Sequence, residues 1–466
     1  MRWGRLGDRL HRAALLLAVF GAVVGGLVIA GLTWWLLWWL LGAKAETPNQ
    51  LDLTKIALSV AAGVGGAVAL VVAYRRQRDL ERGRFAELFG AAARQLGDAD
   101  AAVRIAGVYA MAGVADEFSA PSRRQQCIDV MCGYLQLPYE PADGANHLVS
   151  RAESAEEAGV KVERVYEFRR NDREVRRAIV RVIAQHLKPS AEISWSTCTF
   201  TFNNAVIEKA DFRYAVFRGR HTSFAGATFI GPTTFEFASF AGLHLTFRGA
   251  TFRAGPALFD RAGFGSDRME RREPAGVGTT FAEVTFEDPA SFEGATFRGP
   301  RTDFNGARFL GARTSFQDVK FRAELTSFER AAFDGDHIAF DRAEFTSPRV
   351  TFKSAQFYAT LTAFDEARVG TPNRLRNRGT RETDFSRAEF HGDIRFPRTV
   401  FGGRMVDFTE GDFFGDISFL GTRFAAQEIH FDRPKAWVGT HFDWDDVPTR
   451  KPTSVKPNPW PPTAAG

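Results

Sequence analysis

Between about Phe202 and Phe431 the sequence repeats one short pattern, and this repeat leaves few folds open to the chain. Two phenylalanines stand five residues apart with a small residue between them, as in Phe224-Ala-Gly-Ala227-Thr-Phe229, and the next pair begins six or seven residues later. The period is therefore eleven or twelve positions, which neither a helix nor an ordinary amphipathic strand requires. Of the 44 Phe in the chain, five lie before residue 191. Such a short fixed period predicts a solenoid, in which each unit buries its apolar face by stacking on its neighbours.

The repeat is built on steps of five residues. A small residue lies two positions before a large apolar one at Ala205-Val-Ile207, Ala210-Asp-Phe212 and Ala215-Val-Phe217. One face of a coil is then five residues long, with Phe filling the interior and Ala beside it where the backbone turns closely. The residues between are Arg, Asp, Glu, Gly, Ser and Thr, which suit a solvated surface and tight corners. These units resemble the pentapeptide-repeat family, whose units are Ala-(Asp/Asn)-(Leu/Phe)-x-x, and the resemblance implies a right-handed quadrilateral β-helix.

This sequence departs from the plain family pattern in the one or two extra residues that follow every second unit. We interpret them as corner bulges, so that two phenylalanine pairs, or 22–24 residues, complete one coil. Coils stack at about 4.8 Å, which predicts a rod of roughly 40 Å with a dry ladder of phenylalanine rings inside. Each buried Phe contributes on the order of 2 kcal/mol before conformational entropy is subtracted. The core therefore accounts for nearly all the Phe without a ligand.

Two uncharged, mostly apolar segments near the N-terminus predict membrane-spanning helices. They comprise residues 13–43 and 56–74, joined by an external loop at residues 44–55, and about 20 such residues cross a bilayer. Four tryptophans near the end of the first segment are typical of an interfacial aromatic belt. They are Trp34, Trp35, Trp38 and Trp39.

The charges that flank these segments predict their orientation. Four arginines lie in the basic N-terminal segment 1–12 and five follow the second span, whereas the loop holds only Lys44 and Lys55. The positive-inside rule therefore predicts a multi-pass protein of the cell membrane, with both termini and the repeat in the cytoplasm.

Residues 75–190 predict a small all-helical domain that joins the membrane to the first coil. Apolar residues recur at helical spacing after Asp98 or Asp100, after Ser122 and again after Asp172, whereas residues 141–159 predict a loop. The stretches Arg104–Asp116 and Arg124–Cys132 resemble a region of membrane-bound pentapeptide-repeat proteins of actinobacteria. In that group two spans, a helical region and a Phe-rich repeat follow one another. The resemblance implies this architecture and no activity.

The Phe-rich β-helix is predicted over residues 191–446, and its repeat breaks twice. The gaps from Phe264 to Phe281 and from Val369 to Phe385 are more than twice the usual six or seven positions, which we interpret as loop insertions at 265–280 and 370–384. Four full coils separate them, so both loops should leave from the same corner. Two long loops on one edge of a rigid rod indicate a docking edge for a protein or an anionic surface, and the alternative is tolerated surface insertions. The candidate docking residues are Arg268, Arg271, Arg272, Arg374, Arg376, Arg378 and Arg381.

The C-terminal residues 447–466 hold six prolines and no apolar period, which predicts a disordered Pro-rich tail. Trp437, Phe442 and Trp444, just before it, are expected to cap the last coil.

No residue pattern in the chain indicates catalysis. The nine His are scattered without an Asp, Glu or Cys partner at ligand spacing, and no nucleophile elbow, phosphate loop or zinc-protease motif occurs. Cys127, Cys132 and Cys198 give neither a disulfide framework nor a zinc spacing, and buried structural thiols are the favoured interpretation. We therefore predict no catalytic, cofactor-binding or metal residue, no cofactor, and a protein that is not an enzyme.

Three functions fit these features. The first is a non-enzymatic, membrane-anchored scaffold that presents the rod to a cytoplasmic or membrane protein. The second follows from the family resemblance: a mimic of duplex DNA that binds type II topoisomerase and protects against fluoroquinolones. Mimicry needs a strongly acidic rod, whereas residues from 191 onward hold 35 Lys and Arg against 35 Asp and Glu. The third is a membrane signalling or stress-response component, although an external loop of twelve residues is too short to fold as a ligand domain.

The expected partners follow from the same features. They are a lipid bilayer, bound through two transmembrane helices, and a protein that the sequence does not identify, with no nucleic acid. Dimerisation through coil ends is common in the family, but here the helical domain should block one end and the tail lies at the other. We therefore expect a monomer or a dimer made by the membrane hairpin.

Overall fold

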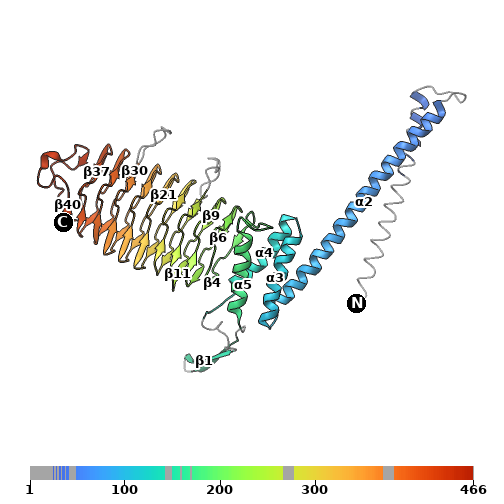
Figure 1. Ribbon diagram of the computed structural model, residues 1–466, viewed down its shortest axis with the longest axis horizontal. Coiled ribbons are helices and arrows are strands. Elements are labelled where there is room, and N and C mark those ends of the chain that lie inside the picture. Colours follow the sequence, from blue (N-terminus) through green and yellow to red (C-terminus); the bar gives the residue numbers. More distant parts are fainter. Residues whose placement is uncertain are drawn as a thin grey trace. The chain divides into compact units, whose positions relative to one another are not determined.

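Figure 1 shows the computed structural model of the 466-residue chain. It describes residues 49–141, 150–157, 160–167, 171–265, 278–370 and 382–464, together with scattered positions between 25 and 40. The chain divides into two compact units, Met1–Leu88 and Phe89–Gly466. The first holds most of a long helix, and the second holds a helical bundle, a β-hairpin and a stack of short strands.

The long helix α2 (Asn49–Leu96) contains the segment Leu58–Leu96, which, among the residues that the structure describes, is the one helix long and apolar enough to cross a membrane. The helix extends beyond the predicted span 56–74 at both ends, which corrects the assignment of residues 49–55 to a loop, whereas the bounds of the span itself stay a prediction. It includes part of the predicted external loop, and it continues past residue 75 without a break. No proline lies between its ends, and strong helix formers such as Gln, Leu, Glu, Arg and Ala flank the apolar segment, so no residue ends it earlier.

The first predicted span, 13–43, lies outside the described residues except at scattered positions. These include the four tryptophans of the predicted aromatic belt, which are helical and exposed. The multi-pass arrangement and its orientation therefore stay predictions.

Three helices of the second unit, α3 (Ala101–Glu117), α4 (Pro121–Gln136) and α5 (Asp172–His186), pack together. Asp100 caps α3, because its side chain accepts a hydrogen bond from the Ala102 amide at 2.8 Å. Helix α4 begins with Pro121, whose missing N–H is not needed at that position. The shared core is formed by fully buried side chains from all three helices: Val108, Met111, Ile128, Met131, Val175, Ile179 and Ile183.

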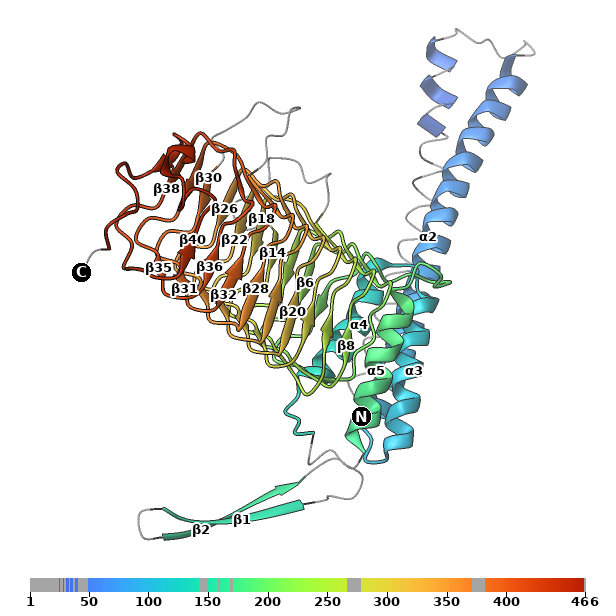
Figure 2. The ribbon, with the colours of Figure 1, turned by 60° about the vertical axis from the view of Figure 1, so that its left-hand side comes forward.

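The predicted all-helical domain also contains a β-hairpin, which is a correction to the sequence analysis. Strands β1 (Ser150–Glu157) and β2 (Val160–Glu167) pair antiparallel, partly within the stretch assigned to a loop. The valines of β2 lie at Val160, Val162 and Val165, and such β-branched residues favour an extended backbone. The hairpin projects from the bundle in Figure 2.

The rest of the second unit is a β-solenoid of the right-handed type with about 10 turns. Its strands form four parallel sheets, here numbered I to IV in chain order, and Figures 1 and 2 show them stacked along one axis. Sheet I contains β3 (Phe200–Thr201), β6 (His221–Ser223), β10 (His244–Thr246), β14 (Gly278–Thr280), β18 (Arg301–Asp303), β22 (Leu325–Ser327), β26 (Arg349–Thr351), β30 (Glu382–Asp384), β34 (Met405–Asp407), β38 (Glu428–His430) and β41 (Val455–Lys456). Sheet II contains β4 (Val206–Glu208), β7 (Thr228–Ile230), β11 (Thr251–Arg253), β15 (Thr285–Phe286), β19 (Arg308–Phe309), β23 (Ala332–Phe333), β27 (Gln356–Phe357), β31 (Glu389–Phe390), β35 (Asp412–Phe413) and β39 (Ala436–Trp437).

The other two faces have nine strands each. Sheet III contains β8 (Thr233–Thr234), β12 (Ala257–Leu258), β16 (Ala290–Ser291), β20 (Arg313–Ser315), β24 (His337–Ala339), β28 (Leu361–Ala363), β32 (Asp393–Arg395), β36 (Ile417–Ser418) and β40 (Thr440–His441). Sheet IV contains β5 (Val216–Phe217), β9 (Ser239–Phe240), β13 (Gly263–Phe264), β17 (Thr296–Phe297), β21 (Lys320–Phe321), β25 (Glu344–Phe345), β29 (Arg368–Val369), β33 (Val400–Phe401) and β37 (Arg423–Phe424).

The strand register confirms the predicted length of one coil. Val206 pairs with Thr228, twenty-two positions further on, and Thr228 pairs with Thr251, twenty-three positions further on. Arg308 pairs with Ala332, twenty-four positions further on. The eleven strands of sheet I make ten steps of about 4.8 Å, so the rod is roughly 48 Å long, longer than predicted because the tail adds a strand.

Four columns of phenylalanine fill the interior, as the repeat predicted. In the column that follows sheet I, successive ring centroids are 4.7–4.9 Å apart and the rings are nearly parallel. Rings of neighbouring columns meet edge to face, as Phe304 and Phe316 do at 5.8 Å and 90°. Both arrangements suit the charge distribution of an aromatic ring. The column comprises Phe202, Phe224, Phe247, Phe281, Phe304, Phe328, Phe352, Phe385, Phe408 and Phe431, all buried.

The C-terminal tail is ordered up to residue 464, which corrects the prediction of disorder for 447–466. It forms a short 3₁₀ helix, η1 (Pro448–Arg450), and strand β41, in which fully buried Val455 extends sheet I beyond β38. The Trp460 ring packs against Phe431 at 5.9 Å and against Phe442 at 5.1 Å. The last coil would otherwise leave rings and a strand edge open to water, and the tail covers both.

Candidate interaction surface

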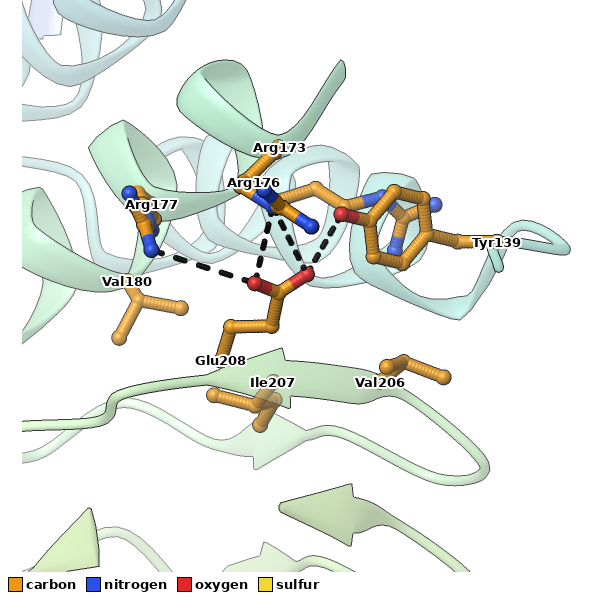
Figure 3. Close-up of a pocket in the computed structure, with 8 residues that line it drawn as sticks. All are labelled: Tyr139, Arg173, Arg176, Arg177, Val180, Val206, Ile207 and Glu208. Carbon is orange, nitrogen blue, oxygen red and sulfur yellow. Dashed lines mark hydrogen bonds and ion pairs between the residues drawn. The ribbon is translucent and has the colours of Figure 1, made fainter. Parts of the chain in front are cut away.

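The helical bundle is joined to the first coil by a cluster around Glu208 of β4. Figure 3 shows the Glu208 carboxylate between Tyr139 and the arginines of α5. The Tyr139 hydroxyl donates to Glu208 Oε1 at 2.6 Å, and Arg173 Nε lies 3.0 Å from Oε2. Burial and the bond to Glu208 raise the pKa of Tyr139. The space between these residues is about 10 Å³, no more than one water molecule, so the cluster is a structural joint rather than a ligand site.

A second buried cluster holds the bundle together beneath that joint. The Asp172 carboxylate lies 2.7 Å from Arg176 Nε and 3.9 Å from Arg104 Nη2, and it accepts a hydrogen bond from the Tyr134 hydroxyl. Arg176 also donates to the carbonyls of Leu135 and Leu137, both at 2.9 Å. These groups are buried and each has its partners, so loss of one member would leave a buried charge without compensation.

One functional-looking pair in this region was not predicted from the sequence. His186 Nε2 lies 3.0 Å from Asp116 Oδ2, and Trp195 Nε1 donates to Asp116 Oδ1 at 2.8 Å. The His186 and Trp195 rings stack with centroids 3.9 Å apart. His186 and Asp116 are 70 residues apart in sequence, so no local spacing could reveal the pair. It ties α3 and α5 to the segment that enters the first coil.

The two insertions leave the rod at points that are built alike. Each begins after a strand of sheet IV, β13 or β29, and ends at a strand of sheet I, β14 or β30. Gly265 and Gly370 are the first residues of the two insertions, with φ of 76° and 72°, and a side chain at either would collide with the backbone of the next coil. Sheet IV has β17, β21 and β25 between the two exits. The prediction that both insertions leave one corner four coils apart, roughly 19 Å, is confirmed.

The described part of the chain covers only the ends of these insertions. The last three residues of each predicted insertion, 278–280 and 382–384, belong to sheet I rather than to a loop. The seven candidate docking arginines, Arg268, Arg271, Arg272, Arg374, Arg376, Arg378 and Arg381, lie outside the described residues.

A groove of about 440 Å³ lies on sheet I beside the first exit. It arises at Gly278, where the ladder lacks a side chain between His244 and Arg301; a Cβ there would lie 2.5 Å from the Arg301 carbonyl oxygen. The positive charges on its wall are largely neutralised, because Arg301 pairs with Asp303 at 2.9 Å and Arg248 forms an ion pair with Glu283. Burial, and the neighbouring His244, lower the pKa of His221 on the groove wall. The groove is therefore polar and nearly neutral.

The described residues show no cluster of three or more His, Cys, Asp or Glu that could hold a metal ion. The three cysteines are buried and free. Burial raises the pKa of Cys127 and of Cys132 to about 12, so both thiols stay protonated at neutral pH. What the rod offers chemically is an outer surface of polar and charged side chains on a rigid backbone.

Comparison with known proteins gives one match. Residues 278–320, just under two turns in the middle of the rod, match the family model for pentapeptide repeats (9 copies). No curated protein and no solved structure matches the chain. The strand register carries the same coil from β3 to β41, well beyond the matched residues.

Proposed function

We propose that this chain, whose rod is built of pentapeptide repeats, is a non-enzymatic, membrane-anchored scaffold that holds a protein partner along one edge of a rigid β-solenoid. The partner would bind where the two insertions leave the rod. The fold itself supports a role in protein interaction, because four sheet faces around a packed interior give a stable, rigid surface.

The observation that carries this proposal is the shared corner of the two insertions. Corners elsewhere on the rod are tight turns of a few residues, whereas this one is extended twice, four coils apart, from the same sheets. A rigid rod keeps the two exits at a constant separation, so one partner can contact both at once. The second contact is then made within the same complex, which raises the overall binding affinity.

Membrane attachment is supported by the apolar half of α2. Its most apolar window is free of buried contacts, as expected of a surface that faces lipid. The arginines that follow it would lie at the cytoplasmic headgroups. The resemblance to membrane-bound actinobacterial pentapeptide-repeat proteins agrees with this arrangement.

Mimicry of DNA is less favoured by the charges on the rod. Outward-facing carboxylates alternate with arginines and pair with them, as Asp318 does with Arg342 and Glu410 with Arg387, both at 2.8 Å. Along the described part of the rod, such pairs place positive charge among the carboxylates, unlike a phosphate backbone.

The test is cross-linking in cells followed by affinity capture. The intact chain is compared with a variant in which both insertions are replaced by short Gly-Ser turns, and with a control whose insertions keep their length and composition but are scrambled. We expect a defined set of proteins that only the intact chain captures, and recovery of the intact chain in the membrane fraction. Capture of the same proteins by all three chains would contradict docking at the insertions, and recovery of topoisomerase would favour mimicry instead.

A further inference from the structure

A stripe of exposed aromatic and aliphatic side chains runs along the last four coils on sheet II, and one of them, His391, lies 3.7 Å from the Asp412 carboxylate. It consists of Tyr358, His391, Phe414 and Val438, each directly after an inward-facing aromatic residue of β27, β31, β35 or β39. The Tyr358 side chain is 42% exposed, Phe414 62% and Val438 54%. Ring centroids of Tyr358 and His391 are 4.8 Å apart, and those of His391 and Phe414 are 5.6 Å apart. We call this set the aromatic stripe.

The stripe is confined to one end of the rod. Earlier positions of the same column are mostly charged. Arg253 and Glu287 separate Ile230 from Leu310, and Asp334 separates Leu310 from the stripe. The hydrophobic core does not require apolar residues at this outward position. Consecutive exposed aromatic and aliphatic side chains in an otherwise mostly charged column are typical of an interaction site.

The backbone beside the stripe leaves it open to a partner. Gly392, Gly415 and Gly439 directly follow His391, Phe414 and Val438. A side chain at any of the three glycines would collide with the carbonyl oxygen of the preceding coil. Over these three coils the corner therefore carries no side chain that could cover the stripe.

Carboxylates lie on both sides of the stripe. Glu389 and Asp412 occupy sheet II next to it, and Asp336 and Asp416 are exposed beyond the glycine corner. Glu389 accepts a hydrogen bond from the Tyr358 hydroxyl. That bond, burial and the nearby acidic side chains raise the pKa of Tyr358 to about 12, so its ring stays neutral in a negative field. Of the nearby cations, Arg395 pairs with Asp393, whereas Lys435 is exposed at the last coil.

The spacing of the stripe favours a helical partner over an extended one. Its four side chains span three coil steps of about 4.8 Å, or roughly 14 Å. A helix places one side chain per turn of about 5.4 Å, which gives roughly 16 Å over three turns. An extended strand places side chains on one face about 6.8 Å apart, or roughly 20 Å over three steps, and loses alignment after the first.

We propose that the aromatic stripe docks an amphipathic helix of a partner protein, whose apolar residues lie on Tyr358, His391, Phe414 and Val438 and whose Lys or Arg residues reach the flanking carboxylates. The proposal rests on the function proposed above for the rod, and it places a second contact on a face other than the insertion edge. Aromatic rings at the centre and charges at the rim match the composition of protein interfaces.

The experiment uses the full-length chain in phosphatidylcholine nanodiscs, with empty nanodiscs as the blank. The probe is a fluorescent peptide of about 18 residues, or five helical turns, with Leu at every third or fourth position and Lys elsewhere. Its counterpart carries Glu in place of Lys. Both peptides hold a photo-reactive residue, so that binding is measured by anisotropy and located by cross-linking.

The variant that removes the stripe is Tyr358→Ser with Phe414→Ser. The matched control is Tyr214→Asn with Phe237→Asn, which removes two exposed aromatic rings at another corner, stacked with centroids 5.0 Å apart. Equal melting temperatures of the two variants show that any difference in binding is local, since all four side chains are exposed.

We expect the Lys peptide to cross-link next to the stripe. It should bind at least about tenfold more weakly to the stripe variant than to the control, and its affinity for the intact chain should fall as the salt concentration rises. Equal binding to both variants, or equal binding of the Glu peptide, would overturn the proposal. So would a change from dimer to monomer in the stripe variant, because a second copy would then be the occupant. Replacing the insertions should leave peptide affinity unchanged, so the two proposals can fail separately.

Discussion

Two carboxylates at one corner of the rod show how strongly the surroundings of a side chain change its pKa. Asp318 receives two hydrogen bonds of 2.8 Å from the Arg342 guanidinium, and these hold its pKa below the usual value. Asp341, in the next coil, is half-buried and accepts the Asp365 amide at 3.0 Å, and burial raises its pKa. The two residues belong to the same type of acidic corner in the sequence, yet their ionisation affects stability in opposite directions.

We expect Asp341→Asn to raise the melting temperature at pH 7 and Asp318→Asn to lower it slightly. A raised carboxyl pKa means that ionisation costs stability in the folded state, so the gain from Asp341→Asn shrinks as the pH falls through that raised pKa. A lowered pKa means that the charged form stabilises the fold, so the loss from Asp318→Asn disappears in acid. The Asp318 effect is small because the pair is nearly half exposed to solvent. Thermal unfolding from about pH 2 to 8 checks this, and shifts of the same sign at pH 7 would contradict it.

At the scale of elements, the tail and the hairpin have opposite relations to the rod. The tail supplies strand β41 and Trp460, both packed on the last coil. The hairpin pairs with itself, and an isolated two-stranded hairpin adds little stability in water. The tail therefore caps the rod, whereas the hairpin is a separate element that adds little to its stability.

Removal of residues 452–466 is expected to lower the unfolding free energy by about 3 kcal/mol, since Val455 and Trp460 lose their burial. The edge of β38 and the rings of the last coil become exposed, so the shortened chain should associate end to end. Size-exclusion chromatography with light scattering and thermal unfolding measure both effects. Replacing β1–β2 by a short linker is the control and should change neither. An unchanged melting temperature for the shortened chain would show that the tail is not a cap.

At the scale of the whole molecule, the rod behaves as a stack of nearly equivalent turns. Each coil contacts its neighbours through the same four sheets and four columns, so stability is close to a sum of nearest-neighbour terms. Position along the rod is then set by counting residues, which is why the two insertions leave the same corner.

Deletion of residues 301–324 removes one complete coil in register, because Arg301 pairs with Leu325. We expect a folded rod that is shorter by about 4.8 Å, with its exits three coils apart, and weaker capture of any partner that contacts both insertions. Deletion of residues 301–312 removes half a coil and moves the second exit to the opposite corner, so capture should be lost. Small-angle scattering and the cross-linking assay report these results. Retention of the partner after the half-coil deletion would show that the geometry of the exits is unimportant.

Much of the architecture could be predicted because it depends on short, repeated spacings. The five-residue step fixes the inward positions of Phe and Ala, and the count between Phe264 and Val369 gives four coils, so periodicity alone determined the solenoid, its coil length and the shared corner. The helices of the bundle were also predicted, from apolar spacing and caps. The local signals were weaker for the hairpin and for the tail, where prolines indicated disorder although two residues suffice to extend a sheet.

Contacts between residues far apart in sequence were decided only by the tertiary structure. Glu208 contacts Tyr139 and Arg173 because the bundle packs against the first coil, and His186 contacts Asp116 because α5 packs against α3 within the bundle. The aromatic stripe likewise exists only after coiling, since its members lie a whole coil apart in sequence and become neighbours one strand spacing apart. A repeat determines which face each residue takes. The stacking of coils, and the packing of the bundle and the tail on the two ends of the rod, determine which side chains come into contact. Those contacts define the surfaces available to a partner.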